Sequence, residues 1–108
     1  MIAVKICGIT SLKDAEMAVN YSVPAIGLIF YPDSPRYVDP AKVEQWIDRI
    51  PDSVKKVGVF VNEQIDTINN ITRQLKLEFI QLHGDESPEF CNGIIRPVIK
   101  VFRVGDDF

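Results

Sequence analysis

The chain has 108 residues, with 12 Lys and Arg against 15 Asp and Glu, a formal net charge of -3 and 46% hydrophobic residues. A chain of this length buries roughly 60 to 70% of the surface that it exposes when unfolded, which is enough for one hydrophobic core and excludes two domains. The acidic balance provides no cationic field for a phosphate backbone, and the longest basic run is Lys55-Lys56. We therefore expect no nucleic-acid partner.

Membrane insertion and secretion are also disfavoured. The longest apolar stretch, residues 23–31, is interrupted by Pro24 and has about half of the roughly 20 residues that a membrane helix needs. The N-terminus has Lys5 inside its first apolar run and no small-residue cleavage pattern, so it does not resemble a signal peptide. Cys7 and Cys91 are far apart, with no Cys-x-x-Cys motif. We expect a reduced, cytoplasmic protein with no membrane partner.

The first predicted elements are a strand and a helix. Residues 2–7 predict a strand, because apolar side chains recur at every second position on one face. Lys5 and Cys7 fall on the opposite face. Thr10 or Ser11 can then cap a helix whose apolar residues follow at helical spacing.

The next segment repeats this order. Residues 25–30 are almost entirely apolar, which is typical of a parallel strand covered on both faces. Two prolines stiffen the following loop, residues 31–38. Asp39 and Pro40 then predict the start of a second helix, which Pro51 ends.

The remaining elements continue the alternation. Residues 56–61 predict a third strand, and Asn62 can cap a third helix with apolar residues on one face. Residues 79–83 predict a fourth strand. Ser87-Pro88 starts a short fourth helix, and residues 98–104 predict a fifth strand.

The alternating order predicts an α/β fold with parallel strands joined by right-handed crossovers. Open doubly wound sheets and (β/α)8 barrels share this local pattern. Polar or reactive side chains lie on one strand face near the carboxyl ends, namely Lys5, Cys7, Gln81 and His83. Gly8 and Gly84 follow the first and fourth strands directly. Because barrels carry their active sites at that end, these details favour the barrel, and no Gly-x-Gly-x-x-Gly motif or P-loop supports nucleotide binding.

Each candidate functional residue also has a structural interpretation. Cys7 could present a thiolate tuned by Lys5 or a helix N-terminus, or be a small buried apolar residue. Arg36 could grip a carboxylate or phosphate at two points, or be a solvated loop residue. His83 could orient a substrate or exchange a proton, or pack. A metal site of Cys7, His83 and Cys91 lacks the usual zinc spacings, so we expect no metal.

Four motifs, in order along the chain, resemble the phosphoribosylanthranilate isomerase family of tryptophan biosynthesis. They are Lys5-Ile6-Cys7-Gly8-Ile9-Thr10, Gly27-Leu28-Ile29-Phe30-Tyr31 leading to Ser34-Pro35-Arg36-Tyr37-Val38, Val57-Gly58-Val59-Phe60-Val61, and Gln81-Leu82-His83-Gly84-Asp85-Glu86. The resemblance implies a cofactor-free (β/α)8 TIM barrel and an Amadori rearrangement of N-(5-phosphoribosyl)anthranilate to 1-(2-carboxyphenylamino)-1-deoxyribulose 5-phosphate.

The resemblance also assigns roles by motif. Cys7 would be the general base that removes the proton from C2′. Arg36 would hold the anthranilate carboxylate, and His83 would line the pocket floor with Gln81 beside it. Lys5 is expected among the substrate-binding residues. Another phosphosugar barrel of the same pathway would need a different residue set at the first and fourth strand ends.

The family barrel is longer than this chain. It needs roughly 200 residues, so we expect residues 1–108 to be the N-terminal portion of one barrel domain, with about five strands and four helices. In the family, the general acid is an aspartate after the sixth strand, and the phosphate site follows strands seven and eight. Asp106 and Asp107 follow the fifth strand, so they are not assigned the acid role. We expect this chain alone to be inactive.

An open sheet would expose its first and last strands as unpaired edges. The alternative to an isomerase is therefore a non-catalytic half-barrel. It would associate with itself through these edges or bind a phosphosugar-like ligand.

Overall fold

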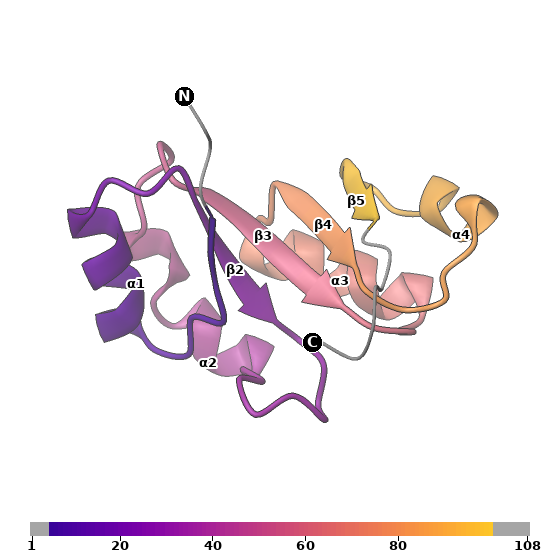
Figure 1. Cartoon of the computed structure of the whole chain (residues 1–108), viewed down its shortest axis with the longest axis horizontal. Helices are drawn as coiled ribbons and strands as arrows, with labels where there is room; N and C mark the ends of the chain where they lie inside the picture. Colours follow the sequence, from indigo (N-terminus) through magenta and orange to yellow (C-terminus); the bar gives the residue numbers. More distant parts are fainter. Residues whose placement is uncertain (1–4, 101–108) are drawn as a thin grey trace.

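The computed structural model describes residues 5–100 of the chain (Figure 1). Over this range strands alternate with helices, and one short 3-10 helix follows the second α-helix. The elements are β1 (Lys5–Cys7), α1 (Leu12–Asn20), β2 (Ala25–Ile29), α2 (Pro40–Glu44), η1 (Ile47–Arg49), β3 (Lys55–Phe60), α3 (Ile65–Leu75), β4 (Phe79–Leu82), α4 (Pro88–Asn92) and β5 (Val98–Lys100).

The strands form one parallel sheet in the order β1-β2-β3-β4-β5, so each strand pairs with the next one along the chain (Figure 1). A doubly wound sheet instead reverses its strand order at a switch point. The sequential order therefore decides between the two folds that the sequence left open, and it is the order of a barrel wall.

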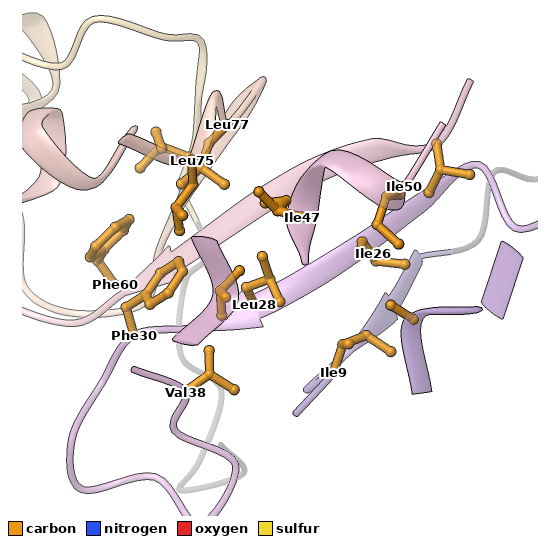
Figure 2. Close-up of a cluster of buried hydrophobic side chains, with 14 of the residues drawn as sticks. Ile9, Ile26, Leu28, Phe30, Val38, Ile47, Ile50, Phe60, Leu75 and Leu77 are labelled. Carbon is orange, nitrogen blue, oxygen red and sulfur yellow. The ribbon is translucent and has the colours of Figure 1, made fainter. Parts of the chain in front are cut away.

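The main hydrophobic core lies on one face of this sheet. Strand residues Leu28, Phe60 and Ile80 are fully buried there, in one cluster with residues of α1, α2, η1 and α3. Figure 2 shows side chains from the helical layer, such as Ile47, directed toward this strand face. The Phe30 and Phe60 rings are tilted, with centroids 5.4 Å apart, a favourable aromatic arrangement. The helices therefore cover one face, as in a barrel wall.

Three helix starts agree with the sequence predictions. Ser11 Oγ accepts the Asp14 N–H at 3.1 Å, Asp39 Oδ1 accepts the Ala41 N–H at 3.0 Å, and Ser87 Oγ accepts the Phe90 N–H at 3.1 Å. Pro40 and Pro88 are the first residues of α2 and α4. Each cap satisfies a backbone donor that the first helical turn leaves without a partner.

The predicted helix from Pro40 to Pro51 is wrong in its continuity. It is divided into the five residues of α2 and the three of η1. The N–H groups of Trp46 and Ile50 bond to the carbonyls three residues back, at Val43 and Ile47 respectively, which is the tighter 3-10 pattern. This pitch still brings Val43, Ile47 and Ile50 into the core.

Asn62 does not cap the third helix. The residue before α3 is Gln64, whose side chain makes no cap hydrogen bond. Asn62 instead has a φ of 51°, in the left-handed region that asparagine tolerates better than most residues. Its side-chain oxygen accepts the Asp85 N–H at 2.8 Å, so it is used between loops rather than within a helix.

Strand boundaries differ slightly from those predicted. The third strand is Lys55–Phe60 rather than 56–61, and the fourth ends at Leu82, one residue before His83. The predicted parts of the first and fifth strands at 2–4 and 101–104 lie outside the described residues. Between residues 5 and 100, no helix is long and apolar enough to cross a membrane.

Asn69 of α3 fixes the segment that leads into β5. Its side chain donates to the Gly93 carbonyl at 2.8 Å and accepts the Ile95 N–H at 3.0 Å, and the residue is 7% exposed. Asn69→Ala should lower the free energy of unfolding by about 1–3 kcal/mol, because two backbone groups lose their partner. Urea denaturation measures this. Asn70→Ala, at the exposed neighbouring position, should stay within about 0.5 kcal/mol, and equal effects of the two substitutions would contradict this account.

Candidate active site

The strand register brings the ends of β1 and β4 toward one level. Cys7 pairs in register with Gly27, Gly27 with Val57, and Val57 with Phe79. In an eight-stranded barrel of shear eight, the strands tilt so that the same level advances by about one residue per strand. The level of Cys7 on β1 is therefore reached about three residues after Phe79, next to His83.

The Cys7 thiol lies over Gly27. A Cβ atom at Gly27 would lie 2.9 Å from Cys7 Sγ, which is too close for a normal contact. The missing side chain thus makes room for the sulfur. Beyond Cys7 the chain turns sharply, because the N–H groups of Gly8 and Ile9 both bond to the Gly27 carbonyl, at 3.0 and 3.1 Å. Gly8 has a φ of 84° there, a conformation that favours glycine.

Arg36 reaches this turn from the loop between β2 and α2. A Cβ atom at Gly8 would lie 2.5 Å from Arg36 Cδ and 3.2 Å from its Nη1, so the arginine side chain lies across the glycine. The loop is held by Ser34 Oγ, which accepts the Arg36 N–H at 3.2 Å, and by the Val38 N–H, which donates to Ile29 O at 3.0 Å. An exposed loop arginine is in this way directed to the end of β1.

Cys7 and Arg36 line one cavity of about 390 Å³. The rest of its lining is mainly the turn after β1 and one side of α1, with Gly8, Ile9, Asp14, Met17, Ala18 and Tyr21. The cavity combines a free thiol, a guanidinium and apolar walls. A thiolate can accept a proton, and the guanidinium can bind a carboxylate or phosphate at two points, so the cavity suits an anionic ligand with an apolar part.

Gln81 and His83 form a second group on the β4 side. Gln81 is buried, and its Nε2 lies 3.4 Å from His83 Nε2. The His83 N–H donates to the Phe60 carbonyl at 3.0 Å. Neither residue lines the cavity that holds Cys7 and Arg36. The structure therefore brings these predicted residues to one end of the sheet. They form two groups, because β1 and β4 are three strand spacings apart, about 14 Å along the sheet.

Lys5 and Cys91, the other two residues considered from the sequence, lie in regular elements. Lys5 begins β1 in register with Ala25. Cys91 is in α4 and packs against the core. Within the described part of the chain, no group of three or more His, Cys, Asp or Glu residues could hold a metal ion.

Gly27 is the site residue whose role the sequence reasoning missed. It stands inside an almost entirely apolar strand, and a glycine at such a position often marks a close approach by another group. The sequence alone therefore indicates that some group approaches Gly27 closely. The identity of the approaching group, the Cys7 sulfur, depends on the register between β1 and β2.

Gly8→Ala tests the turn that carries Cys7 and Arg36. The added methyl group strains the backbone at a φ of 84° and displaces Arg36, so the free energy of unfolding should fall by about 1–2 kcal/mol. Gly93→Ala is the control, because Gly93 has a φ of -85° and its nearest neighbour is the end of a flexible isoleucine side chain. Urea denaturation of both variants measures the difference, and an equal loss at Gly93 would contradict the strain at Gly8.

Comparisons with known proteins agree on one family. The family model for N-(5'phosphoribosyl)anthranilate (PRA) isomerase matches residues 4–108. The chain is 49% identical over 106 residues to the N-(5'-phosphoribosyl)anthranilate isomerase of Geobacter metallireducens, covering 98% of this chain and 52% of that protein. The corresponding enzyme of Geotalea daltonii is 47% identical, with 98% and 51% covered. The chain therefore spans about half the length of the curated relatives it matches.

Solved structures show the same relation. The crystal structure of phosphoribosyl anthranilate isomerase from Thermotoga maritima has a TM-score of 0.89 at 42% identity, covering 93% of this chain and 50% of that one. The Thermus thermophilus structure has a TM-score of 0.91 at 33% identity, with 96% and 53% covered. A further isomerase structure, in complex with reduced 1-(o-carboxyphenylamino)-1-deoxyribulose 5-phosphate, has a TM-score of 0.89 at 42% identity, with 93% and 53% covered.

Proposed function

Since the chain belongs to the N-(5'-phosphoribosyl)anthranilate isomerase family, we propose that the full-length protein with this sequence is an isomerase of tryptophan biosynthesis. Its reaction is the Amadori rearrangement of N-(5-phosphoribosyl)anthranilate to 1-(2-carboxyphenylamino)-1-deoxyribulose 5-phosphate. The fold of the described chain is half of a TIM barrel. The observation that carries the proposal is the shared cavity of Cys7 and Arg36 at the carboxyl end of β1.

Cys7 is the general base of this proposal. Once the ribose ring has opened to an iminium, the Cys7 thiolate takes the proton from C2′, and the electrons of that C–H bond form the enamine while the nitrogen loses its positive charge. Ketonisation at C2′ then gives the product. The space over Gly27 supports this role, because it leaves the sulfur beside a cavity rather than inside the core. The reaction needs a reduced thiol, which suits the cytoplasm.

Arg36 binds the anthranilate end of the substrate. Its planar guanidinium pairs with the carboxylate through two parallel hydrogen bonds. A solved relative binds a reduced product that carries the same carboxyphenylamino group, which supports a carboxylate-bearing ligand for this chain. In the closed barrel of the full-length protein, we propose that His83 lines the floor of the substrate pocket with Gln81 beside it, and that Lys5 contributes to substrate binding.

Residues 1–108 supply only part of this chemistry. The resemblance assigns the general acid to an aspartate after the sixth barrel strand and the phosphate site to the loops after strands seven and eight. The described strands end with β5, and Asp106 and Asp107 lie outside the described residues. We propose that the chain alone holds the base and the anthranilate end but does not complete the reaction.

Cys7→Ala in the full-length protein should lower kcat by about 10²–10⁴-fold, the usual contribution of a general base. Substrate fluorescence, which is lost as the isomerase acts, measures the rate. Cys91→Ala is the matched control, because Cys91 is the other cysteine of the sequence and does not line the cavity. Turnover unchanged in Cys7→Ala would refute the base assignment.

Arg36→Ala should raise KM about 10- to 100-fold, because a charge-assisted hydrogen-bond pair is worth roughly 1.5–3 kcal/mol. Arg36→Lys keeps the charge but not the planar guanidinium, so its KM should lie between that of the wild type and that of Arg36→Ala. Arg49→Ala, at an exposed position on η1, removes an equal charge and should leave KM unchanged. A KM for Arg36→Ala equal to that of the control would place the carboxylate elsewhere.

Self-association is the second candidate function. Among the described residues, β1 pairs only with β2 and β5 only with β4. Large apolar side chains are exposed near these two edges, Tyr21 at 76% beside β1 and Ile99 at 44% on β5. Unpaired parallel edges flanked by apolar side chains favour pairing with another chain.

The 108-residue chain should therefore sediment as a dimer or larger species at micromolar concentration. Ile99→Glu places a charge at the β5 edge and should shift the chain toward the monomer. Glu89→Gln, at an exposed position of α4, is a control that should leave the sedimentation unchanged. A folded chain that is monomeric throughout would exclude edge pairing.

A further inference from the structure

One carboxylate joins the loops that follow β3 and β4. Glu86 Oε2 accepts the Asn62 N–H at 2.8 Å, and Glu86 Oε1 accepts the Gly84 N–H at 2.9 Å. Asn62 lies between β3 and α3, and Gly84 lies between β4 and α4. The two strands are neighbours in the sheet and end side by side (Figure 1). Glu86 therefore connects adjacent loops at the carboxyl end of the barrel wall.

A third hydrogen bond runs in the opposite direction between the two loops. Asn62 Oδ1 accepts the Asp85 N–H at 2.8 Å, while the Asn62 backbone adopts a φ of 51°. The two loops also approach closely at Gly84, where a Cβ atom would collide with Asn62 Oδ1 and lie 2.8 Å from Glu86 Oε2. We call these three hydrogen bonds among Asn62, Gly84, Asp85 and Glu86 the loop clamp.

The loop clamp holds the residue directly after His83. The backbone N–H of His83 itself donates to the Phe60 carbonyl at 3.0 Å, which extends the β3–β4 ladder. His83 is therefore fixed by the sheet at its own nitrogen and by Glu86 at the nitrogen of Gly84. Because both bonds are to backbone, they set where the His83 side chain starts.

We propose that Glu86 is a positioning residue, which holds His83 at the pocket floor through the loop clamp. The proposal rests on the proposed function, which gives His83 its contact with substrate. It needs a carboxylate, because each of the two Glu86 oxygens accepts one N–H. A glutamine keeps one acceptor oxygen and turns an NH₂ group toward the second N–H, so Glu86→Gln opens the clamp with almost no change in side-chain size.

Hydrogen exchange in the full-length protein tests the clamp itself. In Glu86→Gln, the amides of Asn62 and Gly84 should exchange at least about tenfold faster than in the wild type, because a donor without a partner opens more readily. Glu89→Gln is the matched control. It removes the same charge three residues later, at an exposed position, and should leave both amides protected. Unchanged exchange in Glu86→Gln would overturn the clamp.

Kinetics test the positioning role. A displaced substrate-binding residue weakens ground-state and transition-state binding together, so Glu86→Gln should raise KM about tenfold with kcat within about twofold. A merely structural role would reduce the folded fraction, and so lower the apparent kcat at an unchanged KM. In a His83→Ala background, Glu86→Gln should raise KM no further, because the clamp acts through His83.

The outcomes separate this proposal from the function on which it rests. Faster exchange with an unchanged KM, or a KM increase that persists in the His83→Ala background, would overturn the positioning role. A folded full-length wild type without isomerase turnover would overturn the proposed function and the substrate role of Glu86 with it, whereas the exchange measurement would still decide whether the clamp exists.

Discussion

The Gly27 carbonyl oxygen accepts the N–H groups of both Gly8 and Ile9, and the candidate active site depends on this junction of β1 and β2. The two bonds turn the chain immediately after Cys7, which leaves the thiol over the bare Cα of Gly27. The same turn offers Gly8 as the surface on which Arg36 lies. The Cys7 side chain of β1 and the Arg36 side chain of the loop between β2 and α2 thereby meet on one cavity.

The one-sided core explains why this junction can hold. Helix side chains cover one face of the sheet, with Leu28 of β2 fully buried among them, and this burial stabilises β2 as a rigid support. The opposite strand face holds Cys7, Gly27 and Gln81 in alternation with the core residues. In barrel walls, packing commonly holds the strands in place and residues at the strand ends form the active site.

Much of the fold follows from local sequence signals. Ser11, Asp39 and Ser87 predict helix starts correctly because a cap depends only on residues a few positions away. Asparagine is a common helix cap, yet the Asn62 side chain accepts the backbone N–H of Asp85, 23 residues later. The break after α2 likewise depends on how Val43 and Ile47 fit the core, which periodicity alone does not specify.

The candidate site divides in the same way. Cys7, Arg36, Gln81 and His83 could be singled out from residue type and motif. Cys7 and Gln81 lie near the carboxyl ends of their strands, His83 directly follows β4, and Arg36 lies in the loop after β2. The pairing of Cys7 with Arg36 on one cavity, and the separate contact of Gln81 with His83, depend on strand register and loop path. A glycine inside an apolar strand signals a close approach at Gly27, but the group that approaches it, like the bond of Glu86 to Asn62, depends on such long-range contacts.

The central claim is that residues 1–108 carry the base and the anthranilate end of an isomerase site but not the whole site. Isomerase turnover by the purified, folded 108-residue chain tests it most directly, with the full-length protein assayed beside it. The account predicts turnover by the full-length protein and none by the 108-residue chain. Turnover by the 108-residue chain that Cys7→Ala abolishes would contradict it, because the chain would then supply its own acid and phosphate site.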